Sequence, residues 1–255
     1  MNDDISIFVI THKVVDLKKE NLDCIYHKLM VGKQKKDFLE EDLLFDSEGD
    51  NISSKNKNYC ELTGLYWMWK NVKCNVIGLC HYRRFVLNDK LKIMSEKDIK
   101  EVLKKYDIIL PKAERMKNKE NVFSYYKKKH YGDDLLKCRE IIEKIYPEYL
   151  KTFDKVIYGK KYYPFNMFIM SKSNCNQYCK WLFTIFNELE KLIDIDERDD
   201  YQKRVYGFLS ERLFYVWILN NKLKIKENFI LKTDINRKDK IKFYIKFFLY
   251  KIKNT

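Results

Sequence analysis

Glycine and proline are scarce in this chain of 255 residues, which contains 7 Gly and 3 Pro. No stretch rich in Ser, Gly or Pro interrupts it, so the composition gives no sign of a flexible linker between large domains. With 45% hydrophobic residues the chain can bury one sizeable core. We therefore expect one domain over residues 1–225, followed over residues 226–255 by a tail of different character.

Targeting and membrane-spanning signals are also missing. The acidic start, Met1-Asn2-Asp3-Asp4, has neither the basic nor the apolar part of a signal peptide. No apolar run approaches the ~18 residues of a membrane span. The seven cysteines are an odd number without a CxxC pair, which argues against a disulfide framework and against a zinc site. These absences predict a protein that is made and kept in the cytoplasm with reduced thiols.

Motifs of several enzyme classes are absent. The chain has no GxxxxGKS/T and no GxGxxG, which removes the main support for an ATPase or a dinucleotide-binding dehydrogenase. HExxH and a serine nucleophile elbow are missing as well. The one DxD string, Asp194-Ile195-Asp196, stands at the end of a predicted helix, a poor position for holding a divalent ion against a nucleotide. We therefore assign no metal ligands, and a role for Mn²⁺ or Mg²⁺ as cofactor stays open.

The net charge of +14 directs attention to anionic partners. Nucleic acid, an anionic membrane surface and a phosphate-bearing substrate all fit such a charge. Part of it reflects composition, because Lys, Asn and Ile are all abundant. The lysines are dispersed or terminal and no nucleic-acid-binding motif occurs, so we keep a nucleic-acid-binding module as the alternative function and expect no nucleic acid as partner.

Short apolar runs alternate with helical spacing along the chain. We predict strands over residues 5–10, 76–80, 106–110 and 165–170, and helices over residues 58–71, from 95, and over 133–146, 174–192 and 199–220. Residues 32–57 and 112–131 are predicted to be loops. This alternation implies an α/β fold with a largely parallel central sheet, in which ligands bind at the carboxyl ends of the strands.

Polar groups follow two of these strands. Thr11-His12-Lys13 comes after the first strand, and His81-Tyr82-Arg83-Arg84 comes after the second. Arginine offers a planar fork of donors to phosphate oxygens and keeps its charge at every relevant pH. The second cluster therefore suits a diphosphate, although a surface ion-pair cluster is the alternative.

A further group of charges lies on the predicted helix 199–220. Arg204, Gly207 and Glu211 share one face of that helix, with a glycine between two charges where a ligand could approach closely. Asp199 and Asp200 stand at the start of the helix, where its dipole favours negative charge. Arg204 and Glu211 could equally form a structural ion pair.

The tail interleaves aromatic and aliphatic residues with lysine. Residues 240–253 hold five Lys and no acid. On a helical wheel Lys242, Lys246 and Lys253 share one side. The other side holds Ile241, Tyr244, Ile245, Phe248 and Ile252. Such a basic amphipathic helix is typical of an interfacial membrane anchor, and a terminal helix or strand docked on the core is the alternative.

Several blocks of the sequence, which span about residues 5–220, form a recognisable pattern. They are Thr11–Lys13, Gly49–Ser53, Asn56–Trp67, Trp69–Asn71, Gly78–Phe85, Asn166–Met170 and Tyr201–Leu213. Together these blocks resemble a family of bacterial capsular and exopolysaccharide synthesis proteins that are regarded as glycosyltransferases. The resemblance implies a GT-A-like fold, a single α/β domain with a mostly parallel central sheet flanked by helices, here followed by the basic amphipathic helix.

The resemblance also implies a reaction. A sugar, galactose or galactofuranose in some relatives, would pass from a nucleotide-sugar such as a UDP-sugar to a growing glycan in capsular, exopolysaccharide or lipopolysaccharide synthesis. The acceptor would be an oligosaccharide or a polyprenyl-diphosphate-linked glycan at the inner face of the cell membrane, a location that suits the basic tail. An inactive scaffold of a polysaccharide assembly complex is the further alternative.

Residue roles follow from the same resemblance. Ordinary GT-A enzymes carry a metal-binding DxD at the position of His81 to Arg84, so we expect Arg83 or Arg84, with His81, to neutralise the donor diphosphate. Asn166 would contact the sugar. Glu211, ahead of Asp199 or Asp200, would accept the proton of the acceptor hydroxyl if the enzyme inverts. The other expected substrate contacts are Thr11, His12, Lys13, Asp50, Asn51, Tyr82 and Arg204.

Overall fold

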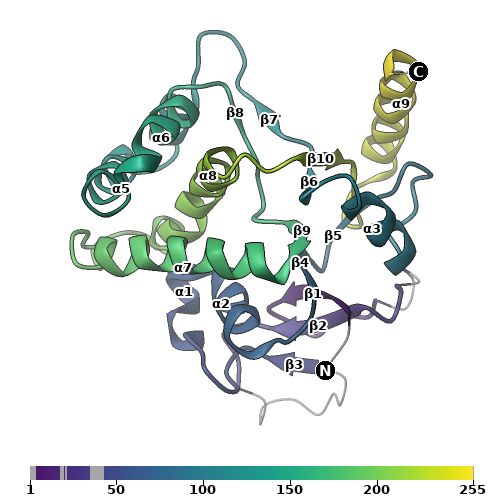
Figure 1. Cartoon of the computed structure of the whole chain (residues 1–255), viewed down its shortest axis with the longest axis horizontal. Coiled ribbons are helices and arrows are strands. Elements are labelled where there is room, and N and C mark those ends of the chain that lie inside the picture. The colour runs from purple at the N-terminus through teal and green to yellow at the C-terminus, as the bar shows by residue number, and fades with distance from the viewer. Residues whose placement is uncertain (1–3, 18–19, 21, 35–42, 255) are drawn as a thin grey trace.

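A nine-stranded sheet runs through the part of the chain that the structure, a computed structural model, describes: residues 4–17, 20, 22–34 and 43–254 (Figure 1). Its main strands lie in the order β10-β6-β9-β4-β1-β2-β3. Their bounds are β1 Ile5–Thr11, β2 Tyr26–Met30, β3 Leu43–Phe45, β4 Val76–His81, β6 Ile108–Pro111, β9 Phe168–Ser171 and β10 Ile225–Asn228. β9 is antiparallel to both of its neighbours, and the other pairs in this row are parallel.

Two short strands extend the sheet beyond this row. β5 (Arg84–Val86) pairs antiparallel with the end of β4 and with β11 (Ile230–Lys232). A separate antiparallel pair is formed by β7 (Glu114–Arg115) and β8 (Lys161–Tyr162). The mostly parallel sheet confirms the predicted fold class.

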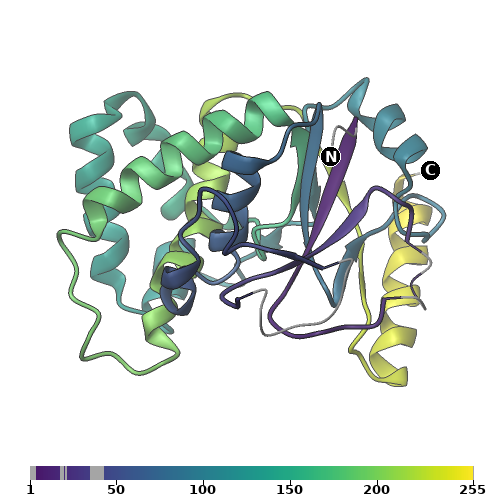
Figure 2. The same cartoon turned by 90° about the horizontal axis from the view of Figure 1, so that it is seen from below.

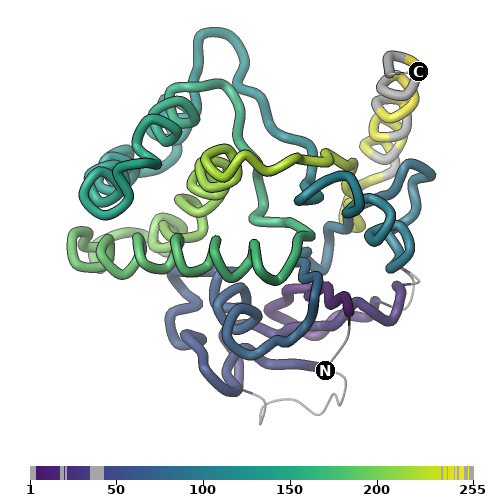
Figure 3. The backbone as a smooth tube through the Cα atoms, viewed as in Figure 1, coloured from purple at the N-terminus to yellow at the C-terminus, as the bar shows by residue number. Residues whose placement is uncertain are grey.

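Helices cover both faces of the sheet (Figure 2). They are α1 Asn56–Tyr59, α2 Leu62–Asn71, α3 Glu96–Leu103, α4 Val122–Lys127, α5 Gly132–Ile145, α6 Leu150–Ile157, α7 Lys172–Leu189, α8 Val205–Asn220 and α9 Arg237–Asn254. α5 to α8 gather on one side of the sheet, and α3 and α9 lie on the other. The backbone trace shows α9 near α3 (Figure 3).

The strand side chains alternate between two apolar clusters. On β1, Phe8 and Ile10 belong to the larger cluster, which also includes residues of α2, α7 and α8, whereas Ile7 and Val9 belong to a smaller cluster that includes Ile99 of α3. Successive side chains of a strand point to opposite faces of the sheet. Because both faces are covered, the central strands read as continuous apolar runs, which is why they could be predicted.

Some elements differ from the expectation. Residues 32–57 hold β3, a 3₁₀ turn at Ser53–Lys55 and the start of α1, although residues 35–42 lie outside the described part. Residues 112–131 hold β7 and α4 instead of a loop. These elements and β2 escape prediction because they are short or only partly buried, so their apolar pattern is weak.

The predicted helix 199–220 is shorter in the structure. α8 begins at Val205, and a 3₁₀ turn at Gln202–Arg204 precedes it. The carboxylate of Asp199 accepts hydrogen bonds from the backbone N–H groups of Tyr201 and Gln202, both at 2.9 Å. Asp199 therefore stabilises the turn that precedes α8, and the helix itself begins only at Val205.

The tail contributes to the sheet before it becomes a helix. β10 and β11 bring residues 226–228 and 230–232, placed in the tail by the sequence analysis, into the sheet. The side chains of Tyr244, Lys246 and Lys253 lie outside the described part. Within the described residues, no helix combines the length and the apolar character that crossing a membrane requires.

Gly78 on β4 provides a test of the central packing. A Cβ atom there would lie 2.5 Å from Ile7 Cδ1 and 3.1 Å from the Phe168 carbonyl oxygen. We expect Gly78→Ala to lower the free energy of unfolding by about 1–3 kcal/mol, measured by urea denaturation. Gly132→Ala is the control, because its Cβ would meet the flexible Lys127 chain at 3.2 Å. Equal stability of both variants would contradict this packing.

Candidate functional site

The polar ends of β1 and β4 open onto one cavity of about 400 Å³. The two strands are parallel neighbours with Ile10 opposite His81, so both carboxyl ends reach the same edge of the sheet. The lining residues come from both strand ends, from the residue after β2, from α1 and its flanks, and from the turn before α8. They are Ile10, Thr11, His12, Val31, Asn56, Lys57, Cys60, Glu61, His81, Tyr82, Arg83, Arg84 and Arg204.

The cavity has a strongly positive environment. Partial burial lowers the pKa of the His12 imidazole, and neighbouring cations lower the pKa further, because a protonated ring would be repelled. These cations are Lys13, Arg83, Lys33 and Arg204. Against them the lining offers one carboxylate, that of Glu61. A concave surface of this charge attracts a compact anion such as a diphosphate.

Each arginine is supported on one side. The Arg84 guanidinium lies 4.6 Å from the centre of the Phe165 ring, and that of Arg83 lies 4.8 Å from the Tyr82 ring. Arg83 also forms a 3.0 Å ion pair with Asp234. The Nε atoms of both arginines are buried without a hydrogen-bond partner among the described residues. The aromatic rings thus hold the two guanidinium groups in place, while the Nε–H group of each arginine makes no hydrogen bond to a described residue.

The third arginine approaches the cavity from the turn before α8. Arg204 Nε donates to Cys60 Sγ over 3.2 Å. Burial raises the pKa of the Cys60 thiol to about 11, so this thiol stays protonated near neutral pH and is no nucleophile. Cys60 therefore serves to position Arg204.

His81 is tied to the chain that leads into β9. Its Nε2 atom lies 2.7 Å from the carbonyl oxygen of Phe165. Because a carbonyl oxygen can only accept, Nε2 carries a proton. Burial lowers the pKa of His81, and Arg84 and Arg83 act in the same direction while Glu61 opposes them. The ring is therefore neutral near neutral pH, with Nδ1 unprotonated.

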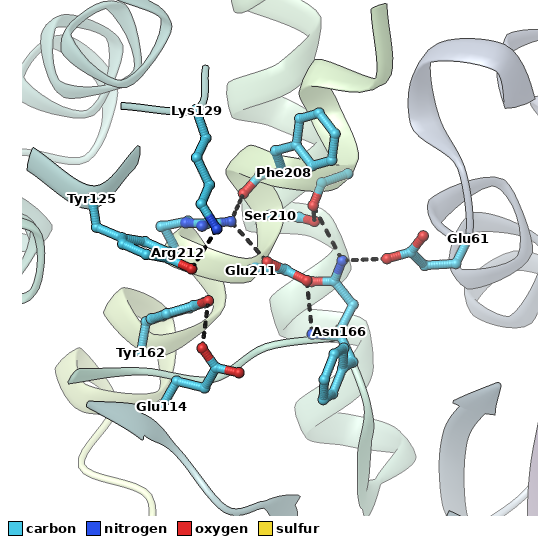
Figure 4. A network of polar contacts seen from close by, with 12 residues as sticks. Glu61, Glu114, Tyr125, Lys129, Tyr162, Asn166, Phe208, Ser210, Glu211 and Arg212 are labelled. Carbon is cyan, nitrogen blue, oxygen red and sulfur yellow. Dashed lines mark hydrogen bonds and ion pairs between the residues drawn. The ribbon is translucent and has the colours of Figure 1, made fainter. Parts of the chain in front are cut away.

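Glu61 and Asn166 form a polar contact at the inner wall (Figure 4). Asn166 Nδ2 donates to Glu61 Oε1 over 2.7 Å. The Asn166 side chain is 2% exposed, and its Oδ1 atom is buried without a partner among the described residues. This amide fixes one oxygen of the carboxylate that lines the cavity.

Glu211 lies on the opposite side of Asn166 from Glu61 (Figure 4). Its Oε1 accepts from the backbone N–H of Phe165 over 2.8 Å, and its Oε2 accepts from Arg212 Nη1 over 2.7 Å. The Arg212 side chain is 4% exposed and that of Glu211 19%. Burial raises the pKa of the Glu211 carboxyl, whereas Arg212 and the Phe165 N–H lower it. Both oxygens are engaged within the protein, and Glu211 does not line the cavity.

The backbone that Glu211 holds is unusual. Phe165 and Asn166 have φ values of +76° and +52°, so they are not part of a strand, and β9 begins at Phe168. Positive φ is strained for residues with a side chain, and Asn tolerates it better than Phe does. The predicted strand 165–170 is thus wrong at its start, where tertiary hydrogen bonds stabilise a turn.

Comparison with known proteins identifies the relatives of this chain. The model of the family described as "Domain of unknown function (DUF4422)" matches residues 6–222. This chain belongs to that family. A search of curated proteins gives no match.

Among solved structures, this DUF4422 chain is similar to WbbM, described as a bifunctional glycosyltransferase in its apo form. The sequence identity is 29% and the TM-score is 0.80. The match covers 91% of this chain and 46% of the other, so the chain spans about half the length of WbbM. The GT-A-like fold expected from the sequence is thereby confirmed.

The structure brings part of the predicted site of the DUF4422 chain together. Among the residues proposed from the sequence, those lining the cavity are Thr11, His12, His81, Tyr82, Arg83, Arg84 and Arg204. The Thr11 hydroxyl is buried and donates to the Lys13 carbonyl, so it shapes the turn after β1. Lys13 Nζ lies 5.6 Å from the centre of the Tyr82 ring, at the edge of the same group.

Other predicted residues lie elsewhere. The backbone N–H of Asp50 donates to Asn71, the last residue of α2, whereas Glu61 precedes the first residue of that helix. The Asn51 side chain accepts from the N–H of Ser53. Neither Asp50 nor Asn51 lines the cavity. Asp199 accepts the hydrogen bonds of the Tyr201 and Gln202 N–H groups and does not line the cavity either.

Asp200 does not line the cavity, but it is paired with a lysine that does. Its carboxylate pairs with Lys57, a lining residue, over 3.0 Å. Lys57 and Glu61 both belong to the block Asn56–Trp67 that carries the resemblance. The sequence alone predicts no role for Lys57 and Glu61, because polar residues around a short helix are typical of a solvated surface.

A divalent metal does not fit the residues at this edge of the sheet. β4 ends at His81 and is followed by the cations Arg83 and Arg84 in place of a carboxylate pair, and Glu61 alone supplies an acidic oxygen to the cavity lining. Within the described residues, no group of three or more His, Cys, Asp or Glu could hold a metal ion. Asp194 of the DxD string instead accepts from the Asp196 N–H over 2.9 Å in an exposed turn.

The buried pair of Glu211 and Arg212 yields a stability prediction. Glu211→Ala would leave the buried Arg212 charge without its partner, and we expect the free energy of unfolding to fall by about 3–5 kcal/mol. Glu188→Ala, which removes an exposed ion pair with Lys191, should change it by at most about 0.5 kcal/mol. Chemical denaturation measures both, and a small effect of Glu211→Ala would rule out the structural role assigned to the pair.

Proposed function

We propose that this chain is a glycosyltransferase that moves a sugar from a nucleoside diphosphate sugar, with UDP as the nucleotide, to a glycan acceptor. The observation that carries the proposal is the convergence of Arg83, Arg84 and Arg204 with His81 on one cavity at the carboxyl ends of β1 and β4. The similarity to a bifunctional glycosyltransferase over 91% of the chain supports it.

The proposed role of the arginines is to hold and stabilise the donor diphosphate. When the bond between sugar and diphosphate breaks, negative charge develops on the departing phosphate oxygens. Donors already fixed around these oxygens stabilise this charge more than they stabilise the intact donor. The stacking of Arg84 on Phe165 and of Arg83 on Tyr82 supplies such fixed donors. In this proposal the arginines perform the task that a divalent ion performs elsewhere.

Glu61 is our candidate for the catalytic carboxylate. It is the one acidic side chain among the lining residues, and Asn166 holds one of its oxygens at 2.7 Å. In an inverting reaction Glu61 takes the proton of the acceptor hydroxyl, whose oxygen forms a bond to the anomeric carbon. The bond from that carbon to the diphosphate breaks, and its electron pair leaves with the phosphate oxygen. Glu211, expected to be this base, is instead proposed to position Phe165 and Asn166.

The sugar and the acceptor are proposed from the resemblance. A galactosyl or galactofuranosyl donor, and an oligosaccharide or polyprenyl-diphosphate-linked acceptor in capsular, exopolysaccharide or lipopolysaccharide synthesis, are the first combinations to assay. The volume of about 400 Å³ suits the diphosphate and the adjoining sugar of such a donor.

Binding of UDP tests the diphosphate site. We expect UDP to raise the melting temperature of the wild type in excess EDTA, and Arg84→Ala or Arg204→Ala to weaken binding about tenfold or more, since each removes a charged hydrogen bond worth about 1.5–3 kcal/mol. Arg139→Ala, which removes a surface ion pair with Asp154, should bind like the wild type.

The same thermal-shift measurement separates the alternatives. Stabilisation by oligonucleotides but not by UDP would favour a nucleic-acid-binding module. Strict dependence on Mn²⁺ or Mg²⁺ together with an active Arg83→Ala variant would refute diphosphate binding by arginine. Binding of UDP-sugars without any transfer or hydrolysis would favour an inactive scaffold.

The catalytic carboxylate is tested by Glu61→Gln with the UDP-sugar that a binding screen selects. This variant keeps the shape of the side chain, so we expect UDP affinity to be preserved and the turnover number to fall by about 10²–10⁴. Glu188→Gln, an exposed carboxylate outside the cavity, is the matched control. A Glu61→Gln enzyme with normal turnover would exclude Glu61, and loss of turnover confined to Glu211→Gln would return the role to Glu211.

A further inference from the structure

The C-terminal helix α9 has an inner face that is packed on the protein. The rings of Phe243 and Phe247 lie 5.9 Å and 5.2 Å from that of Phe229, which stands between β10 and β11. Phe247 is 7% exposed. This contact fixes which side of α9 faces the sheet and therefore which side faces outward.

The outward side of α9 is a continuous apolar stripe. Its residues recur at helical spacing along the whole helix and are 52% to 74% exposed. They are Ile241, Ile245, Phe248, Leu249 and Ile252. These five are half of the ten large apolar side chains that are exposed among the described residues, the others being Val14, Tyr131, Tyr158, Leu192 and Tyr201. A contiguous stripe of this kind marks an interaction surface, whereas scattered exposed residues do not.

The charge of the same helix is strongly positive. The sequence from Arg237 to Asn254 holds one Arg, six Lys and one acid, Asp239, which gives a net charge of +6. Asp239 is engaged locally, because its N–H donates to Asn236 and its carboxylate accepts from the Asn236 amide over 3.0 Å. Lys238 and Lys242 are exposed. The apolar stripe and the positive charge therefore both belong to α9.

We propose that α9 binds the surface of an anionic lipid bilayer, with its apolar stripe inserted at the boundary of headgroups and acyl chains. Burial of apolar side chains and attraction of lysine to anionic headgroups act together in such helices. A second copy of the chain fits this surface poorly, because two α9 helices in contact would each bring a charge of +6.

The bound helix would hold the candidate site close to the membrane. A cavity of about 420 Å³ beside this contact is lined by Lys242 and Phe243 of α9 and also by Phe165. Phe165 is the residue on which Arg84 of the candidate site stacks. This arrangement places the site beside a lipid-linked acceptor at the inner face of the membrane, a consequence that rests on the proposed function, whereas lipid binding by α9 does not.

Vesicle flotation of the full chain tests the proposal. We expect the wild type to float with vesicles of phosphatidylcholine and phosphatidylglycerol, to float far less with phosphatidylcholine alone, and to be released by salt. Phe248→Glu and Ile252→Glu should each weaken binding at least about tenfold, because each removes apolar burial and adds a negative charge. Leu192→Glu makes the same change at an exposed position outside α9 and should float like the wild type.

Controls separate folding, lipid binding and the donor site. Because Phe248 is exposed, Phe248→Glu should keep the melting temperature and the UDP binding of the wild type. Equal flotation of Phe248→Glu and wild type, or no flotation of the wild type, would overturn lipid binding while leaving the proposed function to the UDP assay. Self-association in sedimentation velocity that Phe248→Glu abolishes, without flotation, would assign the stripe to a second copy instead.

Discussion

The parallel pairing of β1 with β4 at the centre of the sheet is the constraint on which the site depends. Its register places Ile10 beside His81, so the residues that follow both strands meet at one edge. Gly78 allows this pairing to coexist with the apolar contacts of Ile7 and Ile169, because no side chain stands between them. A slip of one residue would exchange the two faces of the strand and move the polar ends apart.

Positive charge at this edge is stabilised by the way each cation is held. Three arginines around one cavity repel each other, and burial beside these charges lowers the pKa of His12 and of His81, so neither ring adds a positive charge near neutral pH. Arg83 and Arg84 each lie against an aromatic ring, and Arg83 is also paired with Asp234. These contacts reduce the electrostatic repulsion among the arginines and leave some of their N–H groups without a partner among the described residues. The remaining positive field favours the binding of an anion.

The central strands and the polar residues that follow β1 and β4 could be predicted from the sequence, because a continuous apolar run followed by polar residues is a local signal. The position of Asn166 relative to Glu61 could not be predicted in this way, since these residues are 105 positions apart and meet through tertiary packing. Glu211 was predicted from the sequence to be the base, whereas its hydrogen bonds to the Phe165 N–H and to Arg212 within the protein could not be predicted, because the first depends on the turn at Phe165. Positive φ at Phe165 has no local sequence signal, because a phenylalanine rarely adopts it.

β9 enters the sheet against the direction of its neighbours, and this reversal brings the start of a strand to the edge where other strands end. The cavity and its wall are consequently assembled from six regions of the chain, near residues 11, 31, 60, 82, 166 and 204. Contacts of such long sequence separation form late, after most of the loop-closure entropy has been overcome. The proposed anion site should therefore form only when all of these regions have packed together.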